Sequence, residues 1–328
     1  MRNTSLLVIS LLTMPHAQAN LGTIPTQSGW SGFLFAGVGE QQKLSHFDTD
    51  NGSQTQIDEL TRADKTHRLL PIFNGDVRYT WADSRTQVFL GNLIEDAVRF
   101  DFTQQLGVRQ ELGNKGILAA SLLYSAQPLE QWRDPFEVDT HRQTTDIRSR
   151  GGRVSWDQIW GTPFYGSISH RSITVDDEQS GSQFDDATAA MLARSGHVHA
   201  LSLSYQWHPV SGYLVEPAIL YRQADLDGRA HSNRSYGLQM TFAKHDVQWS
   251  LVSNLYGGKI RYAEANPIFE QFADANEVAM NTTFFWHRLL GLAPLSATVT
   301  ASYARSDSKI PFYDSRSTLF SSGLLYHF

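Results

Sequence analysis

The sequence has no cysteine and no long apolar run, and each absence excludes a class of protein. Without cysteine, the 328-residue chain has no disulfide framework and no thiolate metal site. No stretch approaches the ~18 consecutive apolar residues that a membrane-spanning helix needs. Basic residues are also few, 27 Lys and Arg against 33 Asp and Glu, which argues against a nucleic-acid partner. A chain of this length can form two soluble domains or one large all-β domain.

The N-terminal segment differs in character from the rest of the chain. Arg2 supplies a positive start, Leu6–Leu12 form a short apolar core, and Ala17-Gln18-Ala19 is a small-x-small cleavage site. We therefore predict a signal peptide at 1–19 and one β-barrel domain at 20–328. Because no cysteine follows the cleavage site, a lipoprotein is excluded.

Alternation of apolar and polar side chains at every second residue recurs through the mature chain. In the segment 295–303, Leu, Ala, Val, Ala and Tyr alternate with Ser and Thr, so one face is apolar and the other is small and polar. A period of two residues predicts half-buried strands. Fourteen such segments are predicted, at 31–47, 68–82, 86–92, 100–112, 116–126, 144–159, 163–175, 194–208, 213–226, 234–244, 245–262, 276–287, 295–308 and 320–328.

The connections between these segments alternate in length. Long polar connections follow most odd-numbered segments, at 48–67, 127–143, 176–193 and 263–275. Short turns follow the even-numbered segments, at 82–85, 113–115, 160–162, 209–212, 244–246 and, somewhat longer, 289–294. Short turns on one side and long loops on the other are typical of outer-membrane barrels.

These features together predict an all-β fold, a transmembrane antiparallel up-and-down β-barrel. About fourteen strands are expected, with twelve possible, joined by short periplasmic turns and long extracellular loops. A sheet can cross hydrocarbon only when it is closed, because every backbone polar group must then be paired within the protein. The expected location is the outer membrane of a Gram-negative cell. The expected partners are outer-membrane lipid, lipopolysaccharide and the assembly machinery. No nucleic acid and no cofactor are expected, and the sequence does not determine the oligomeric state.

The C-terminus carries a further outer-membrane feature. Leu324, Tyr326 and the terminal Phe328 share one face of the last predicted strand. This pattern resembles the signal that the outer-membrane assembly machinery reads, and we interpret these three residues as that signal.

The faces opposite the apolar ones should line the barrel interior, and they are charged. Two interpretations stay open: a hydrated pore whose charged wall screens solutes, or a network of ion pairs that fills the lumen. A bulge at Gly151-Gly152 is expected, because charged residues change parity there. The predicted pore-lining residues are Asp76, Arg78, Asp101, Arg109, Glu111, Arg148, Arg150, Arg153, Glu216 and Arg222.

Candidate catalytic patterns lie in the loops. Asp48-Thr49-Asp50 and Asp139-Thr140-His141 resemble the acid and Asp–His pairs of outer-membrane proteases, and His231-Ser232 is superficially like a phospholipase motif. Each pattern is also expected by chance. We predict that the protein is not an enzyme, with a hydrolase at the barrel rim as the alternative.

Candidate metal patterns are equally sparse. Asp48, Asp50 and Glu59 match part of a calcium-loop spacing, but Ser53 stands where the turn glycine belongs. His197-Val198-His199 places two histidines on one strand face, with no third ligand evident. No metal site is therefore predicted.

At the level of segments, the chain resembles a family of uncharacterised outer-membrane β-barrel proteins of gammaproteobacteria, a domain-of-unknown-function family. The resemblance rests on Leu70-Pro71-Ile72-Phe73, on Trp132-Arg133-Asp134-Pro135-Phe136 and on Trp160-Gly161-Thr162-Pro163-Phe164. It implies a compartment and a fold, and it carries over no catalytic residue.

The function predicted from the sequence is a porin-like, passive or weakly selective channel for small hydrophilic solutes. The alternative is a non-conducting barrel with a structural, adhesive or surface-enzyme role carried by its extracellular loops. The two differ in whether the lumen is open at its narrowest cross-section.

Overall fold

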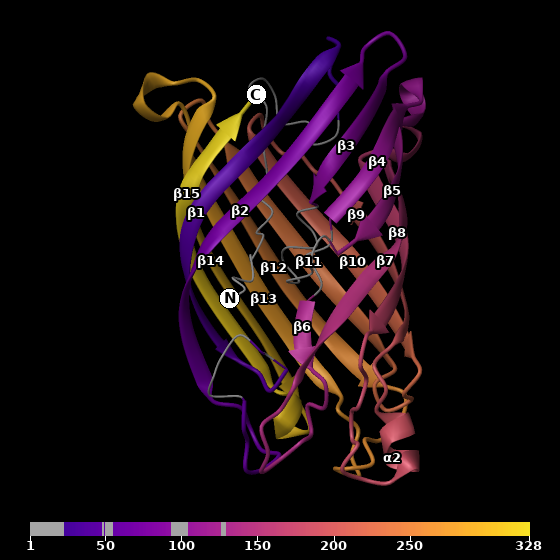
Figure 1. Cartoon of the computed structure of the whole chain (residues 1–328). Coiled ribbons are helices and arrows are strands. Elements are labelled where there is room, and N and C mark those ends of the chain that lie inside the picture. Colours follow the sequence, from indigo (N-terminus) through magenta and orange to yellow (C-terminus); the bar gives the residue numbers. More distant parts are fainter. Residues whose placement is uncertain (1–22, 48, 50–54, 93–103, 126–128) are drawn as a thin grey trace.

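The alternating segments of the sequence pair edge to edge into one closed antiparallel barrel (Figure 1). The computed structural model describes residues 23–47, 49, 55–92, 104–125 and 129–328, so the predicted signal peptide lies outside the described residues. The strands are β1 Gly29–Leu44, β2 Lys65–Trp81, β3 Thr86–Asn92, β4 Gln104–Glu111, β5 Ile117–Tyr124, β6 Leu129–Trp132, β7 Thr144–Asp157, β8 Phe164–Val175, β9 Gly196–Tyr205, β10 Tyr213–Leu226, β11 Asn233–His245, β12 Trp249–Tyr262, β13 Ala275–Trp286, β14 Leu295–Ser308 and β15 Ser315–His327.

The fifteen strands occupy fourteen positions in the ring. β5 and β6 both pair with β7, one after the other, so they act as a single interrupted strand. Every other strand pairs with its neighbour in chain order, and β15 pairs with β1 to close the sheet. The predicted fourteen-strand barrel is confirmed.

Successive side chains point alternately to the inside and the outside of the barrel. On β14, Ser296, Thr298 and Thr300 are buried on the inner face, whereas Val299 and Tyr303 are exposed on the outer face. Exposed apolar side chains recur on the outer face all around the ring, which is the surface that hydrocarbon covers in a membrane barrel.

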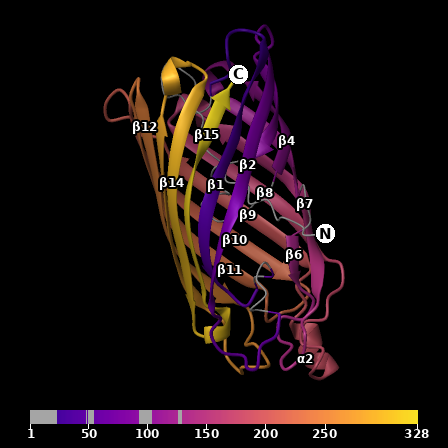
Figure 2. The same cartoon turned by 60° about the vertical axis from the view of Figure 1, so that its left-hand side comes forward.

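The two ends of the barrel differ in the length of their connections, as the sequence predicts (Figures 1 and 2). At the turn end, short connections contain η2 Gly113–Lys115, η3 Ile159–Gly161 and η4 Leu289–Gly291. At the loop end, the connections include the long one that contains α2 Asp186–Met191 and a shorter one that contains η5 Pro311–Tyr313. Among the described residues, no helix is both long and apolar enough to cross a membrane.

Candidate functional site

Charged side chains gather on the inner face of the first strands of the barrel. Arg78 forms an ion pair with Asp76, with 2.6 Å between guanidinium nitrogen and carboxylate oxygen. On the neighbouring strands, Arg109 donates a hydrogen bond to Gln87 at 3.1 Å, and Gln87 donates to Thr80 at 2.9 Å. These bonds link β2, β3 and β4 into one inward-facing polar wall.

The same wall continues across β7 to β10. Arg109 interacts electrostatically with Asp157, which lies on β7, as well as with Asp76 and Arg78. Glu216 on β10 accepts a hydrogen bond of 2.5 Å from Ser204 on β9 and interacts electrostatically with Asp157. Carboxylates and guanidinium groups are therefore mixed along the inner surface.

Glu111 belongs to a separate contact at the turn end. Arg85 donates to Glu111 at 2.5 Å and also to the backbone carbonyls of Ile24 and Pro25 at 2.6 Å. The segment that precedes β1 is thereby tied to the end of β4.

Arginines dominate the inner face nearer the loop end. Arg153 on β7, Ser169 on β8, Ala200 on β9 and Arg222 on β10 are successive partners across the strands, so the two arginines are in register on the same face. Arg171 on β8 shares this face, one inward position closer to the loop end. Arg171 was not among the predicted pore-lining residues. Its two-residue spacing from Ser169 and Ile173 could have shown that it shares their inner face.

The prediction that Arg148 and Arg150 face the lumen is wrong. β7 keeps a continuous register with both β5 and β8, so there is no bulge at Gly151-Gly152. Arg148 and Arg150 therefore share the outer face with Val154, which is 46% exposed. Arg148 forms an ion pair of 2.7 Å with Asp176.

The two glycines of β7 have another explanation. A Cβ on Gly151 would lie 1.9 Å from the carbonyl oxygen of His170, so this position requires close approach of the backbones. Glycine pairs of this kind mark a bulge or close packing, and only the register separates the two. Of the other predicted pore-lining residues, Asp101 lies outside the described residues.

Part of the inner wall is apolar, which the sequence analysis missed. Phe33 and Phe35 on β1, Leu70 and Ile72 on β2, and Leu325 on β15 are buried on the inner face. They belong to one cluster with Leu214, Ala243, Val252, Phe285 and Leu319. The lumen is thus charged along one arc of the ring and apolar or hydroxyl-lined along the other.

The loops form a second hydrophobic core at their end of the barrel. Phe312, in the connection between β14 and β15, packs on Phe136, in the connection between β6 and β7, with ring centroids 5.3 Å apart. These connections leave nearly opposite points of the ring, so they can meet only by crossing the barrel mouth. We call this assembly the loop cap; its buried apolar residues are Ile57, Phe136, Leu192, Ala230, Ala273, Ile310 and Phe312.

Buried polar groups join the loop cap together. His231 contacts the carbonyl oxygen of Leu192 at 2.8 Å and the hydroxyl of Tyr313 at 2.8 Å, and Asn266 donates to that hydroxyl at 2.7 Å. Burial, followed by the charge of Arg194, lowers the pKa of His231 to about 4. Burial also raises the pKa of Tyr313. Both groups are therefore neutral around pH 7.

Two acidic residues stabilise the loops, Asp134 between two connections and Glu178 within one. The Asp134 carboxylate accepts hydrogen bonds from the backbone of Phe136, Gly181 and Ser182 at 2.9 to 3.0 Å. Glu178 pairs with Arg194 at 2.9 Å. Burial alone would raise the pKa of Glu178, but the hydrogen bonds and charge of Arg194 outweigh it and lower the pKa.

The candidate catalytic pairs that lie among the described residues are not assembled. Asp139 and His141 are exposed and form no hydrogen bond or ion pair with each other. His231 and Ser232 each bond to other groups, Ser232 to the carbonyl oxygen of Leu226. Asp48, Asp50 and Ser53, which belong to the calcium-loop pattern, lie outside the described residues.

Two aromatic side chains, Trp132 at the end of β6 and Phe136 in the connection to β7, are buried. Trp132 is 2% exposed and Phe136 is fully buried. The guanidinium of Arg142 lies over the Trp132 ring, 4.3 Å from its centroid. Phe136 therefore belongs to the loop cap, whereas Trp132 is covered by Arg142.

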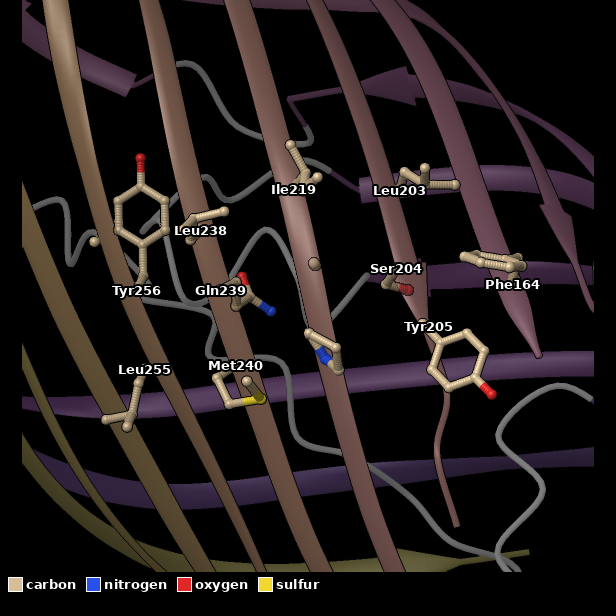
Figure 3. Close-up of a pocket in the computed structure, with 13 residues that line it drawn as sticks. Phe164, Leu203, Ser204, Tyr205, Ile219, Leu238, Gln239, Met240, Leu255 and Tyr256 are labelled. Carbon is tan, nitrogen blue, oxygen red and sulfur yellow. The ribbon is translucent and has the colours of Figure 1, made fainter. Parts of the chain in front are cut away.

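The outer face carries an apolar groove of about 570 Å³ over β9 to β12 (Figure 3). Leu203, Ile219, Leu238, Met240 and Leu255 line it from the outer face. Pro217 lies in the same groove and has no backbone N–H for the ladder. The groove belongs to the apolar belt rather than to an aqueous site.

The three residues of the predicted assembly signal share the outer face. Leu324, Tyr326 and Phe328 are each close to half exposed. Phe328 and Gly32 exchange two backbone hydrogen bonds of 3.1 Å, so the chain end is anchored to β1. Their recognition by the assembly machinery stays a prediction.

Solved outer-membrane structures resemble the chain over most of its length at low identity. OmpT, an outer membrane protein of Vibrio cholerae, is 11% identical with a TM-score of 0.39, covering 91% of this chain and 97% of that chain. The outer membrane channel DcaP of Acinetobacter baumannii is 11% identical with a TM-score of 0.42, covering 94% and 100%. A Pseudomonas aeruginosa FadL homologue is 9% identical with a TM-score of 0.41, covering 90% of both.

No curated protein matches the chain. One family profile does, and its description is protein of unknown function (DUF2860). The match extends over residues 29–327, from the first residue of β1 to the last of β15. The resemblance noted at the level of sequence segments is thereby confirmed, and the chain belongs to this family.

Proposed function

We propose that the protein is an outer-membrane channel for small hydrophilic solutes, with its loop end facing outward. The observation that carries this proposal is the charged inner wall of β2 to β10 inside a closed barrel. Charged groups are costly to bury unless they form ion pairs or are hydrated. In a water-filled lumen these side chains can be hydrated and can still pair with one another. The presence of both charge signs, in Asp76, Arg78, Arg109 and Asp157, supports weak rather than strong charge selectivity.

Export and assembly are part of the same proposal. The signal peptide at 1–19 would direct export, and the outward Leu324, Tyr326 and Phe328 would be read during insertion. Deletion of Phe328 should lower the amount of folded barrel in outer-membrane fractions, measured by heat-modifiable migration. Unchanged insertion would contradict the assembly role of this residue.

Conductance of the refolded protein in a planar bilayer tests the channel. We expect stable steps that scale with salt and a reversal potential in an ion gradient. Neutralising Arg109 on the inner wall by Arg109→Gln should shift the reversal potential toward cation preference. Arg150→Gln removes the same charge from the outer face and is the matched control, expected to leave the reversal potential unchanged.

A second function is favoured by the loop cap. Because loops from opposite sides of the ring meet in one hydrophobic core, the cap can act as a folded surface module on a barrel that does not conduct. A folded, heat-modifiable barrel that never conducts would reject the channel and support this role. Neither proposal includes catalysis.

A further inference from the structure

Three histidines gather on the outer face of β8 and β9 near the loop end. His170 on β8 lies directly opposite His199 on β9, and His197 follows two residues away on the same face. All three side chains are exposed. None of them takes part in the proposed channel, because they point away from the lumen.

Their height on the barrel gives them access to water. Tyr221 and Tyr236 pair on the outer face with ring centroids 5.2 Å apart, and aromatic girdles mark the edge of the hydrocarbon layer. Tyr221 is the partner of Leu201, and His199 lies one outward position beyond Leu201, toward the loop end. The histidines therefore lie in the head-group layer, which ions reach from the aqueous phase.

The geometry of the first two rings matches a metal chelate. The Nδ1 atoms of His170 and His199 are 3.3 Å apart. Two nitrogens bound to one tetrahedral zinc at 2.0 to 2.1 Å are separated by roughly 3.3 to 3.4 Å. The two nitrogens thus already stand at the distance that a shared metal ion requires.

We propose that His170, His199 and His197 bind a divalent late transition metal, such as Zn²⁺, Ni²⁺ or Cu²⁺, at the outer surface. Imidazole is a preferred ligand of these ions. His170 and His199 are the preformed pair, and His197 is the third ligand. The sequence pattern contained only His197 and His199, and the structure adds His170 from the neighbouring strand.

His197 completes the site by a side-chain rotation. Its ring stacks beside that of His170, with centroids 5.2 Å apart and planes 24° apart. Across the described residues, no three His, Asp or Glu side chains are already gathered around one point. Asp225 is the direct partner of His197 on β10 and is exposed, so its carboxylate or water can fill the fourth position.

The surroundings leave the pair open to an ion. On β7 the partner of His170 is Gly152, which has no side chain to cover the rings. The outer-face cations of β7, Arg150 and Arg148, lie farther toward the loop end, and Arg148 is paired with Asp176.

Without metal, the Nδ1–H of one ring donates to the Nδ1 of the other ring. When the metal binds, that hydrogen moves to Nε2 of its own ring, and both Nδ1 lone pairs coordinate the ion.

The test is titration of Zn²⁺ into the untagged, detergent-solubilised barrel at about pH 7.5, where histidine is mainly neutral. We expect one ion per chain by calorimetry, with His199→Ala and His170→Ala each weakening binding by about tenfold or more. His197→Ala should weaken it less, because the preformed pair remains. His208→Ala is the matched control, an exposed histidine outside the cluster, and should change nothing.

A spectroscopic readout identifies the ligands directly. Bound Cu²⁺ should show nitrogen hyperfine splitting that loses one nitrogen in His199→Ala, while heat-modifiable migration shows that the variant is folded. Absence of stoichiometric binding in the native chain would overturn the proposal. So would binding that survives the double variant His170→Ala/His199→Ala or that depends instead on His245, which lies near His287 inside the barrel. Neither result depends on whether the barrel conducts.

Discussion

The two ends of this barrel are built on different principles. At the turn end, each connection joins adjacent strands and is shaped by its own backbone: Trp160 and Leu290 adopt left-handed conformations with φ of 54° and 55°, each followed by a glycine. At the loop end, connections that are far apart in the sequence share one hydrophobic core. Local geometry therefore decides the turns, whereas long-range packing decides the loop cap.

This difference has a consequence for stability. Contacts between turns involve neighbours, such as Lys115 over the Trp160 ring, whereas a buried residue of the loop cap contacts loops from opposite sides of the ring. Phe312, for example, stacks on His46 with ring centroids 4.4 Å apart, besides packing on Phe136. Loss of one such side chain should loosen loops from opposite sides of the ring together.

The largest effect should come from Phe312→Ala. Removal of this fully buried ring should cost the loop cap about 3–5 kcal/mol, seen as faster amide exchange in several loops at once. Phe184→Ala is the control, since Phe184 lies in a loop but is 43% exposed. Exchange limited to the mutated loop would show that the loops do not share one core.

Acidification should open the loop cap next. The pKa of His231 falls from its ordinary 6.5 to about 4 in the folded cap, so the folded form excludes a proton that the open form accepts. The stabilisation is complete above about pH 6.5 and is lost as pH falls toward 4, roughly 3 kcal/mol in all.

Limited proteolysis of the loops at pH 7 and pH 5 measures this change. His231→Gln has no titrating ring and should make cleavage less dependent on pH over that interval. The same pH dependence in the variant would assign the effect to another group.

A smaller loss is expected for Asp134→Asn. The amide cannot accept all the backbone hydrogen bonds that the carboxylate receives from the neighbouring loop, which should cost about 1–3 kcal/mol. Amide exchange of Gly181 and Ser182 reports it. Asp177→Asn changes an exposed carboxylate, and an equal effect there would argue against a specific role for Asp134.

The smallest effect should appear at the turn end. Leu290→Gly relieves a left-handed backbone and should stabilise the barrel by about 0.5–1 kcal/mol in denaturant unfolding. Leu292→Gly, at a φ of −83°, should instead be neutral or destabilising. Neither variant should alter amide exchange in the loop cap, because the two ends do not share a core.

The strands, their number and the alternation of short and long connections could be predicted from the sequence. Alternation such as that of Leu295 to Tyr303 is written in neighbouring residues, so a strand and its apolar face are visible without knowledge of its partners. Closure of the ring then follows, because an open sheet edge has no hydrogen-bond partner in hydrocarbon.

The position of the inner wall, the loop cap and the histidine cluster depended on strand register and on long-range packing, which neighbouring residues in the sequence do not encode. A shift of register by one residue exchanges the inner and outer faces, which is why the glycine pair of β7 led to the wrong face for Arg148 and Arg150. The loop cap and the pairing of His170 with His199 join residues far apart in the chain. Sequence by itself determined the barrel, because the period of a strand is a local property. Only the tertiary structure decided which side chains meet, because register and loop packing depend on residues far apart in the chain.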